Sequence, residues 1–146
     1  MKYFSFLLLF AYTSVFSQQV DYNAKKFIAE GYDVVSYFNN QAVEGNNNFI
    51  VEYDGVKFRF SSDKNLKKFK ENPTKYIPQY GGYCAYAMAY SDKVKIDPET
   101  YEIKDGKLYL FYNSWGTNTL EKWLEKKTET LRKKADENWG QLKYKN

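Results

Sequence analysis

Two Asp-Gly pairs, each placed between short apolar runs, constrain the fold of this chain more than any other feature of its sequence. Asp54-Gly55 separates residues 49–53 from 56–60, and Asp105-Gly106 separates residues 101–103 from 108–112. Tight hairpin turns favour Asp and Gly because both central turn positions need a positive φ. The sequence therefore predicts two β-hairpins.

Helical patterns surround these hairpins. Ser61-Ser62-Asp63 supplies N-cap side chains for a helix over residues 63–71, which Asn72-Pro73 ends. Residues 83–90 are small and apolar enough for a short buried helix. From residue 119 to about 138, apolar side chains recur at helical spacing opposite a face of Lys and Glu, at Leu120, Trp123, Leu124, Leu131 and Ala135.

Together these patterns predict an α+β fold. We expect a small single domain in which β-hairpins pack against helices, with a long amphipathic helix near the C-terminus. No internal repeat is evident in the sequence.

The first 17 residues have the order of a secretory signal peptide. Lys2 precedes an apolar stretch from Phe4 to Ala11, and cleavage is expected after Ser17. The stretch is shorter than the roughly 20 residues that span a bilayer, so no stable membrane anchor is expected after cleavage. We therefore expect a signal peptide at 1–17, one domain at 18–146, and an exported protein that is periplasmic or secreted.

Composition excludes several classes of function. The chain has no His and a single Cys, so neither an intrachain disulfide nor an imidazole-dependent site can form. No nucleophile has a recognisable base beside it, and we therefore expect no enzymatic activity. The formal net charge is +4, and Lys residues are interleaved with Asp and Glu, so no nucleic-acid partner is expected.

Residues 51–62, continued by 68–76, resemble the YHS domain. The shared pattern is a strand, a glycine turn, an aromatic strand and a helix that ends in Phe-x-x-Asn-Pro-x-x-Tyr. Flanking motifs at residues 31–33, 78–87, 105–110 and 134–139 look like those of an exported bacterial subgroup of that family. The resemblance implies a YHS-like core.

Many members of this family carry two cysteines that are suspected of binding soft metals. The matching positions here hold Ser61 and Asn65, so metal binding cannot be carried over from them. Both residues are instead expected to satisfy free backbone N–H groups at the start of the helix.

Cys84 is the position at which a ligand site is expected. It follows Gly81-Gly82 at the start of a predicted helix, where the positive end of the helix dipole favours a thiolate. Met88 lies four residues further on, on the same helix face. A thiolate and a thioether suit a soft metal ion such as copper, so Cys84 and Met88 are predicted metal ligands. The simpler interpretation, that both residues merely pack in the core, stays open.

Three further residues are candidates for contact with a small ligand: Tyr83, Asp33 and Tyr37. In the alternative interpretation, Asp33 caps a turn or helix and the tyrosines pack with their hydroxyls hydrogen-bonded. We expect a non-enzymatic module that binds a metal ion or small ligand through Cys84. The alternatives are a thiol-based redox or sensor protein and a purely structural or interaction domain with a buried Cys. The sequence indicates no particular protein partner.

Overall fold

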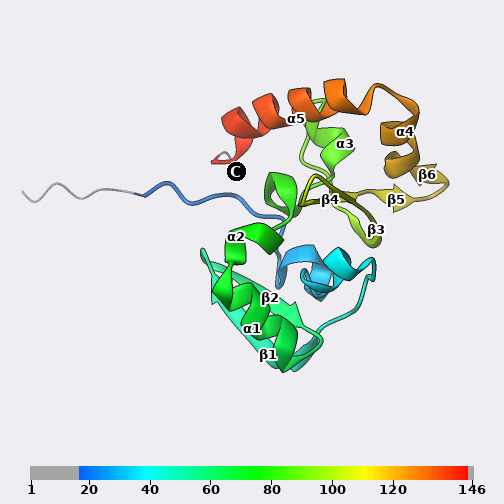
Figure 1. Ribbon diagram of the computed structural model, residues 1–146. Coiled ribbons are helices and arrows are strands. Elements are labelled where there is room, and N and C mark those ends of the chain that lie inside the picture. Colours follow the sequence, from blue (N-terminus) through cyan, green and yellow to red (C-terminus); the bar gives the residue numbers. More distant parts are fainter. Residues whose placement is uncertain (1–16, 145–146) are drawn as a thin grey trace, which may run out of the picture.

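The computed structural model describes residues 17–144, in which small antiparallel sheets are surrounded by helices (Figure 1). The elements in chain order are η1 (Ile28–Gly31), η2 (Ser36–Asn39), β1 (Asn46–Tyr53), β2 (Val56–Phe60), α1 (Asp63–Glu71), α2 (Pro73–Tyr76), η3 (Gln79–Gly82), α3 (Ala85–Met88), β3 (Asp97–Lys104), β4 (Lys107–Phe111), β5 (Asn113–Ser114), β6 (Thr117–Asn118), α4 (Thr119–Glu125) and α5 (Thr128–Leu142). Elements marked η are short 3₁₀ helices. The α+β prediction is confirmed. The predicted signal peptide falls almost wholly on residues 1–16, which lie outside the described part.

Both predicted hairpins are confirmed. β1 pairs with β2 through a turn at Asp54-Gly55, and β3 pairs with β4 through a turn at Asp105-Gly106. All four turn residues have positive φ, between 50° and 77°. A third, very short hairpin (β5–β6) turns at Trp115-Gly116 and was not predicted from the sequence.

The helix over residues 63–71 is confirmed with the predicted bounds. Its N-cap is Ser62, whose Oγ accepts the N–H of Asn65 at 3.1 Å. The helix predicted over residues 83–90 is shorter, because only Ala85–Met88 are helical.

The prediction of one continuous helix over residues 119–138 is wrong, because the chain leaves the helical conformation at Lys126 (ψ 177°) and forms α4 and α5. Thr128 stabilises the break, since its hydroxyl donates to the carbonyl oxygen of Trp123 at 2.9 Å. Leu124, which the helical pattern placed on the apolar face, is exposed.

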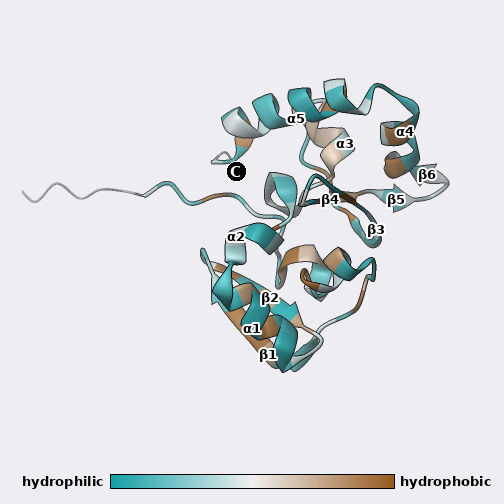
Figure 2. Cartoon of the chain, viewed as in Figure 1, coloured by the Kyte–Doolittle hydropathy of each residue, from teal (hydrophilic) through white to brown (hydrophobic). Residues whose placement is uncertain are grey.

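The core consists of two clusters that meet at β4. Leu108 and Leu110 of β4 pack with Phe58 and Phe60 of the first hairpin and with Phe69 of α1. The alternate β4 residues pack in the second cluster, which includes Tyr109, Phe111, Met88, Trp123 and Ala135. Both faces of β4 are therefore buried, as expected for a strand between two layers. Figure 2 shows that α5 is largely hydrophilic, while α3, which packs against it, is more hydrophobic.

Within residues 17–144, no helix combines the length and the apolar character that crossing a bilayer requires.

Candidate functional site

Asp33 is a fully buried carboxylate that joins two distant parts of the chain. Its Oδ1 accepts the backbone N–H groups of Val35 at 2.9 Å and Ser36 at 3.2 Å. Its Oδ2 accepts the N–H of Ser61 at 2.9 Å, the hydroxyl of Ser61 at 2.6 Å and the side-chain amide of Asn65 at 2.8 Å. A buried carboxylate is tolerated when its acceptor sites are filled in this way. Asp33 therefore ties the η2 segment to the start of α1.

Ser61 and Asn65 differ from the expectation that their side chains bond free N–H groups of the helix. Both side chains donate to Asp33, and the side-chain cap of α1 comes from Ser62. The sequence could not reveal this, because Asp33 lies about thirty residues away and only the fold brings it close. A hydroxyl and an amide engaged with a carboxylate do not fit a soft metal ion.

Cys84 precedes α3 as predicted, and its side chain is fully buried. The N–H of Tyr112 points at Sγ at 3.4 Å, and Sγ lies 3.3 Å from Oγ1 of Thr119. The Thr119 hydroxyl donates to the carbonyl oxygen of Tyr112 at 2.8 Å, so the thiol is left to donate to Thr119. The sulfur is therefore both an acceptor and a donor within the core.

Met88 is also fully buried, and it belongs to the cluster beneath α5, whereas Cys84 belongs to the cluster around the first hairpin. Among the described residues, no group of three or more His, Cys, Asp or Glu side chains could hold a metal ion. The assignment of Cys84 and Met88 as metal ligands stays a prediction.

The two candidate tyrosines have different surroundings. Tyr37 is buried, its hydroxyl donates to the carbonyl oxygen of Pro98 at 2.6 Å, and burial raises its pKa well above the usual range. Tyr83 is partly exposed and donates to Asp21 at 3.3 Å. Partial burial, followed by the negative charge of Asp21, raises the pKa of Tyr83 to about 12. The predicted ligand residues thus fall on two segments: Asp33 and Tyr37 lie just before and within η2, and Tyr83 and Cys84 lie just before α3.

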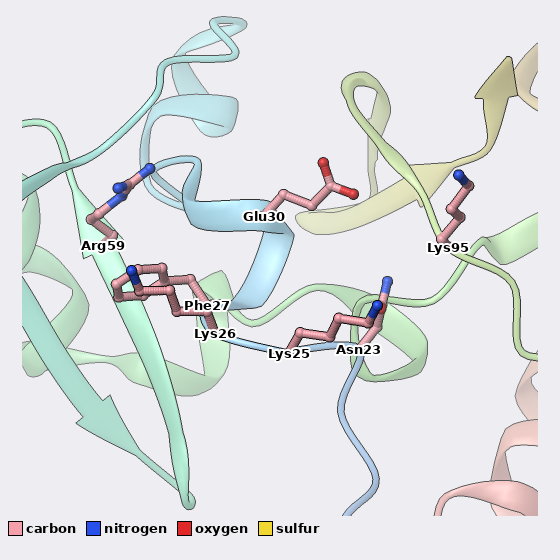
Figure 3. Close-up of a pocket in the computed structure, with 7 residues that line it drawn as sticks. All are labelled: Asn23, Lys25, Lys26, Phe27, Glu30, Arg59 and Lys95. Carbon is pink, nitrogen blue, oxygen red and sulfur yellow. The ribbon is translucent and has the colours of Figure 1, made fainter.

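A pocket of about 430 Å³ brings several charged side chains together, and we call it the basic pocket. It is lined by Asn23, Lys25, Lys26, Phe27, Glu30, Arg59 and Lys95. Figure 3 shows Arg59 on one side and Lys95 on the other, with residues of the N-terminal segment between them. Four positive side chains and one negative side chain therefore surround a single hollow.

Arg59 forms a fixed wall of the basic pocket. Its Nε donates to the carbonyl oxygen of Gly31 at 3.2 Å, Nη2 to Glu44 at 2.9 Å and Nη1 to Asn47 at 3.3 Å. Its Cζ also lies 5.0 Å from the centroid of the Phe27 ring, a cation–π distance. The guanidinium is therefore held in place on several sides, and its ion pair with Glu44 offsets part of its charge.

The comparison with protein families matches one segment of the chain. Residues 34–80 match the family model of the YHS domain. This part of the chain is a YHS domain. The domain contains β1, β2, α1 and α2, so Ser61 and Asn65 lie inside it, while Cys84 lies outside. No curated protein and no solved structure matches the chain significantly.

The basic pocket lies at the border of the YHS domain and was missed in the sequence. Arg59 comes from the YHS domain, whereas Lys25, Lys26 and Lys95 come from the segments before and after it. The adjacent pair Lys25-Lys26 beside Phe27 was the only local signal. Arg59 and Lys95 join that pair only through tertiary structure.

Proposed function

We propose that this protein is a non-enzymatic module that binds a small organic anion in the basic pocket. The observation that carries the proposal is the convergence of Lys25, Lys26, Arg59 and Lys95 on one hollow, opposed only by Glu30 among the lining residues. Carboxylate and phosphate groups are the ligand chemistry that such a set of ammonium and guanidinium donors recognises.

The lysines of the pocket are available to a ligand. Lys25, Lys26 and Lys95 are exposed, and none of them forms an ion pair with a residue in the described part of the chain. Arg59 uses three of its five N–H groups on Gly31, Glu44 and Asn47. The remaining donors support contact with an incoming oxyanion.

The size and the lining of the pocket support a small organic molecule. A volume of about 430 Å³ lies within the range of ordinary ligand sites. Phe27 lines the pocket beside the cations, although only 9% of it is exposed and Arg59 and Lys26 lie over its ring. The lining contains no Ser, Thr, Cys or His, so it lacks hydroxyl and thiol nucleophiles and an imidazole base, which supports binding over hydrolysis.

The proposal is tested by titrating the protein with inorganic phosphate and with citrate while amide chemical shifts are recorded. We expect saturable shifts centred on residues 23–30, Arg59 and Lys95, weaker at high salt because exposed charges are screened. The double variant Lys25→Gln with Lys95→Gln should weaken citrate binding by about tenfold, since each exposed ion pair contributes up to roughly 1 kcal/mol.

A matched control is the double variant Lys107→Gln with Lys122→Gln, which removes the same charge from exposed sites outside the pocket. It should bind citrate as the unaltered protein does. Equal weakening by both double variants, or shifts spread over all surface lysines, would show non-specific attraction and contradict the proposal.

We also propose that the protein is exported. The order of charge, apolar stretch and small residues at 1–17 supports this. Sequencing the N-terminus of the protein made in its native cell should find Gln18 first, and an intact Met1 would contradict export by this route.

A further inference from the structure

The order of elements in the described chain occurs twice. The first unit, residues 28–76, runs η1, η2, β1, β2, α1 and α2. The second unit, residues 79–131, runs η3, α3, β3, β4, α4 and the start of α5, with the short β5–β6 hairpin inserted between β4 and α4. The hairpins have equal strands, eight residues in β1 and β3 and five in β2 and β4. Each hairpin also has a register shift at the same place, before Ile50 in one and before Tyr101 in the other.

The backbone of the two units agrees in its unusual conformations. Three consecutive residues before each unit's first loop have positive φ: 48°, 54° and 87° at Ala29, Glu30 and Gly31, and 56°, 61° and 82° at Tyr80, Gly81 and Gly82. Such runs are uncommon outside glycine. The matching residues are separated by a constant 51 positions, which is also the separation of the two Asp-Gly turns.

Backbone hydrogen bonds repeat at the same separation. The N–H of Asp33 donates to Val43 at 2.8 Å, and the N–H of Cys84 donates to Val94 at 3.0 Å. The loops that follow close in the same way: the bonds from Asn40 to Tyr37 and from Gln41 to Ser36 match those from Ser91 to Met88 and from Asp92 to Ala87. Donor and acceptor are thus conserved pair by pair between the units.

Asp33 and Cys84 occupy the same place in this scheme. The N–H of Ser61 donates to Asp33, and the N–H of Tyr112, 51 positions further on, donates to Cys84. The β5–β6 hairpin then adds residues, so helix positions match at a separation of 54. Asn65 of α1 bonds Asp33, and its counterpart Thr119 of α4 contacts Cys84.

The aromatic packing of the helices obeys the same correspondence. Phe69 of α1 packs on Phe58 and Phe60, with ring centroids 4.5 Å and 5.2 Å away. Trp123 of α4 packs on Tyr109 and Phe111 at 6.1 Å and 5.5 Å, which are the matching strand positions.

We infer that the chain is a tandem of two copies of one structural unit, of which the family comparison recognises the first, and that Cys84 is the counterpart of Asp33. Identity between the copies is scattered, which is why the sequence shows no evident repeat. At a separation of 51 the identical pairs are Gly31 and Gly82, Tyr32 and Tyr83, Val43 and Val94, Asp54-Gly55 and Asp105-Gly106, and Phe60 and Phe111; at a separation of 54 they are Leu66 and Leu120, Lys68 and Lys122, Glu71 and Glu125, and Thr74 and Thr128. Cys84 then has a structural role: its hydrogen bonds with Tyr112 and Thr119 hold the end of β4 and the start of α4 against the loop before α3.

If Cys84 corresponds to Asp33, the donors that surround Asp33 should have counterparts around position 84. Asp33 bonds the N–H groups of Val35 and Ser36, whose counterparts are Tyr86 and Ala87 in the first turn of α3. N–H groups in a first helical turn have no acceptor within the helix, and α3 has no side-chain cap. An Asp at position 84 would find three backbone N–H donors at the matching places, those of Tyr86, Ala87 and Tyr112. The Thr119 hydroxyl, which donates to the carbonyl oxygen of Tyr112, would have to turn to become a fourth.

The test is the variant Cys84→Asp in the full chain. The control is Ala135→Asp, which places a carboxylate at an equally buried small residue of α5. Position 135 does not correspond to Asp33 in the first unit. We expect Cys84→Asp to fold, with a Tm within about 5 °C of the unaltered protein. Ala135→Asp should lose more than about 10 °C, or fail to fold, because its carboxylate has no arranged donors.

Amide proton shifts provide a second measurement. In Cys84→Asp the amide protons of Tyr86, Ala87 and Tyr112 should move downfield, because a charged acceptor shortens these hydrogen bonds. The inference is overturned if Cys84→Asp is as destabilised as Ala135→Asp. It is also overturned if Cys84→Asp folds without these three downfield shifts.

Discussion

At the scale of single residues, the thiol of Cys84 is enclosed by its contacts with Tyr112 and Thr119. Thiol chemistry requires access as well as thiolate character. We therefore expect no reaction of the native protein with a chromogenic disulfide over minutes, and reaction of one thiol per chain after unfolding in guanidinium. Rapid native reaction would contradict the enclosed geometry and favour a redox or sensor role.

Lys126 sets the acidity of a surface tyrosine. Its Nζ donates to the hydroxyls of Tyr86 and Tyr90, each at 3.0 Å. The hydrogen bond from Lys126 is the main cause that lowers the pKa of Tyr90, since an ammonium donor stabilises the phenolate. The variant Lys126→Met should therefore raise the pKa of Tyr90 toward the usual value of about 10. An NMR titration of the Tyr90 ring carbons measures this change. Lys122→Met, in the helix that ends just before Lys126, is the control and should leave the Tyr90 titration unchanged.

At the scale of elements, we expect alanine substitutions at two glycines, one in α5 and one in the η3 turn, to change the free energy of unfolding in opposite directions. Gly81 in η3 has a φ of +61°, and a Cβ there would lie 2.7 Å from the ring of Trp139. Gly140 lies within α5, and a Cβ there would meet nothing within 4 Å. We expect Gly81→Ala to lower the free energy of unfolding by about 2 kcal/mol. Gly140→Ala should raise it by about 1 kcal/mol through helix propensity.

Urea denaturation of the two variants measures both effects. Equal changes in the two variants would mean that α5 does not cover the η3 turn. The prediction needs the structure, because the sequence alone gives no reason to treat these two glycines differently.

At the scale of the whole molecule, the features predicted correctly are those that depend on neighbouring residues. The Asp-Gly turns and the Ser62 cap depend on residues that are neighbours in sequence, and both are confirmed. The role of Asp33 and the convergence of Arg59 and Lys95 depend on contacts between distant segments, which no local pattern encodes. The break between α4 and α5 was missed because the apolar spacing continues through it, while the backbone does not.

The repeat was hidden for a related physical reason. The two units share backbone conformation and hydrogen bonding, and these tolerate different side chains wherever an equivalent donor or acceptor is supplied. An Asp carboxylate and a Cys thiol both accept the strand-end N–H, and Phe69 and Trp123 both cover a hairpin. The positions that remained alike include the glycines and turn residues that the backbone itself requires.

The two units share one core, so we expect them to unfold together. Leu108 and Leu110 of the second unit pack in the cluster of Phe58, Phe60 and Phe69 of the first. Asp33→Ala removes the acceptor of five hydrogen bonds in the first unit, which should cost about 3 kcal/mol because buried donors lose their partner.

All three Trp residues lie at or after position 115, so their fluorescence reports the second unit and its C-terminal helix. We expect Asp33→Ala to lower the Tm measured by Trp fluorescence as much as the Tm measured by far-UV circular dichroism. The control Asp92→Ala, which removes an exposed carboxylate, should change neither Tm. A Trp transition that stays in place while the circular dichroism splits in two would show that the units fold independently. The buried contacts across β4 favour the single transition, because the apolar surface on its two faces is covered only when both units are folded.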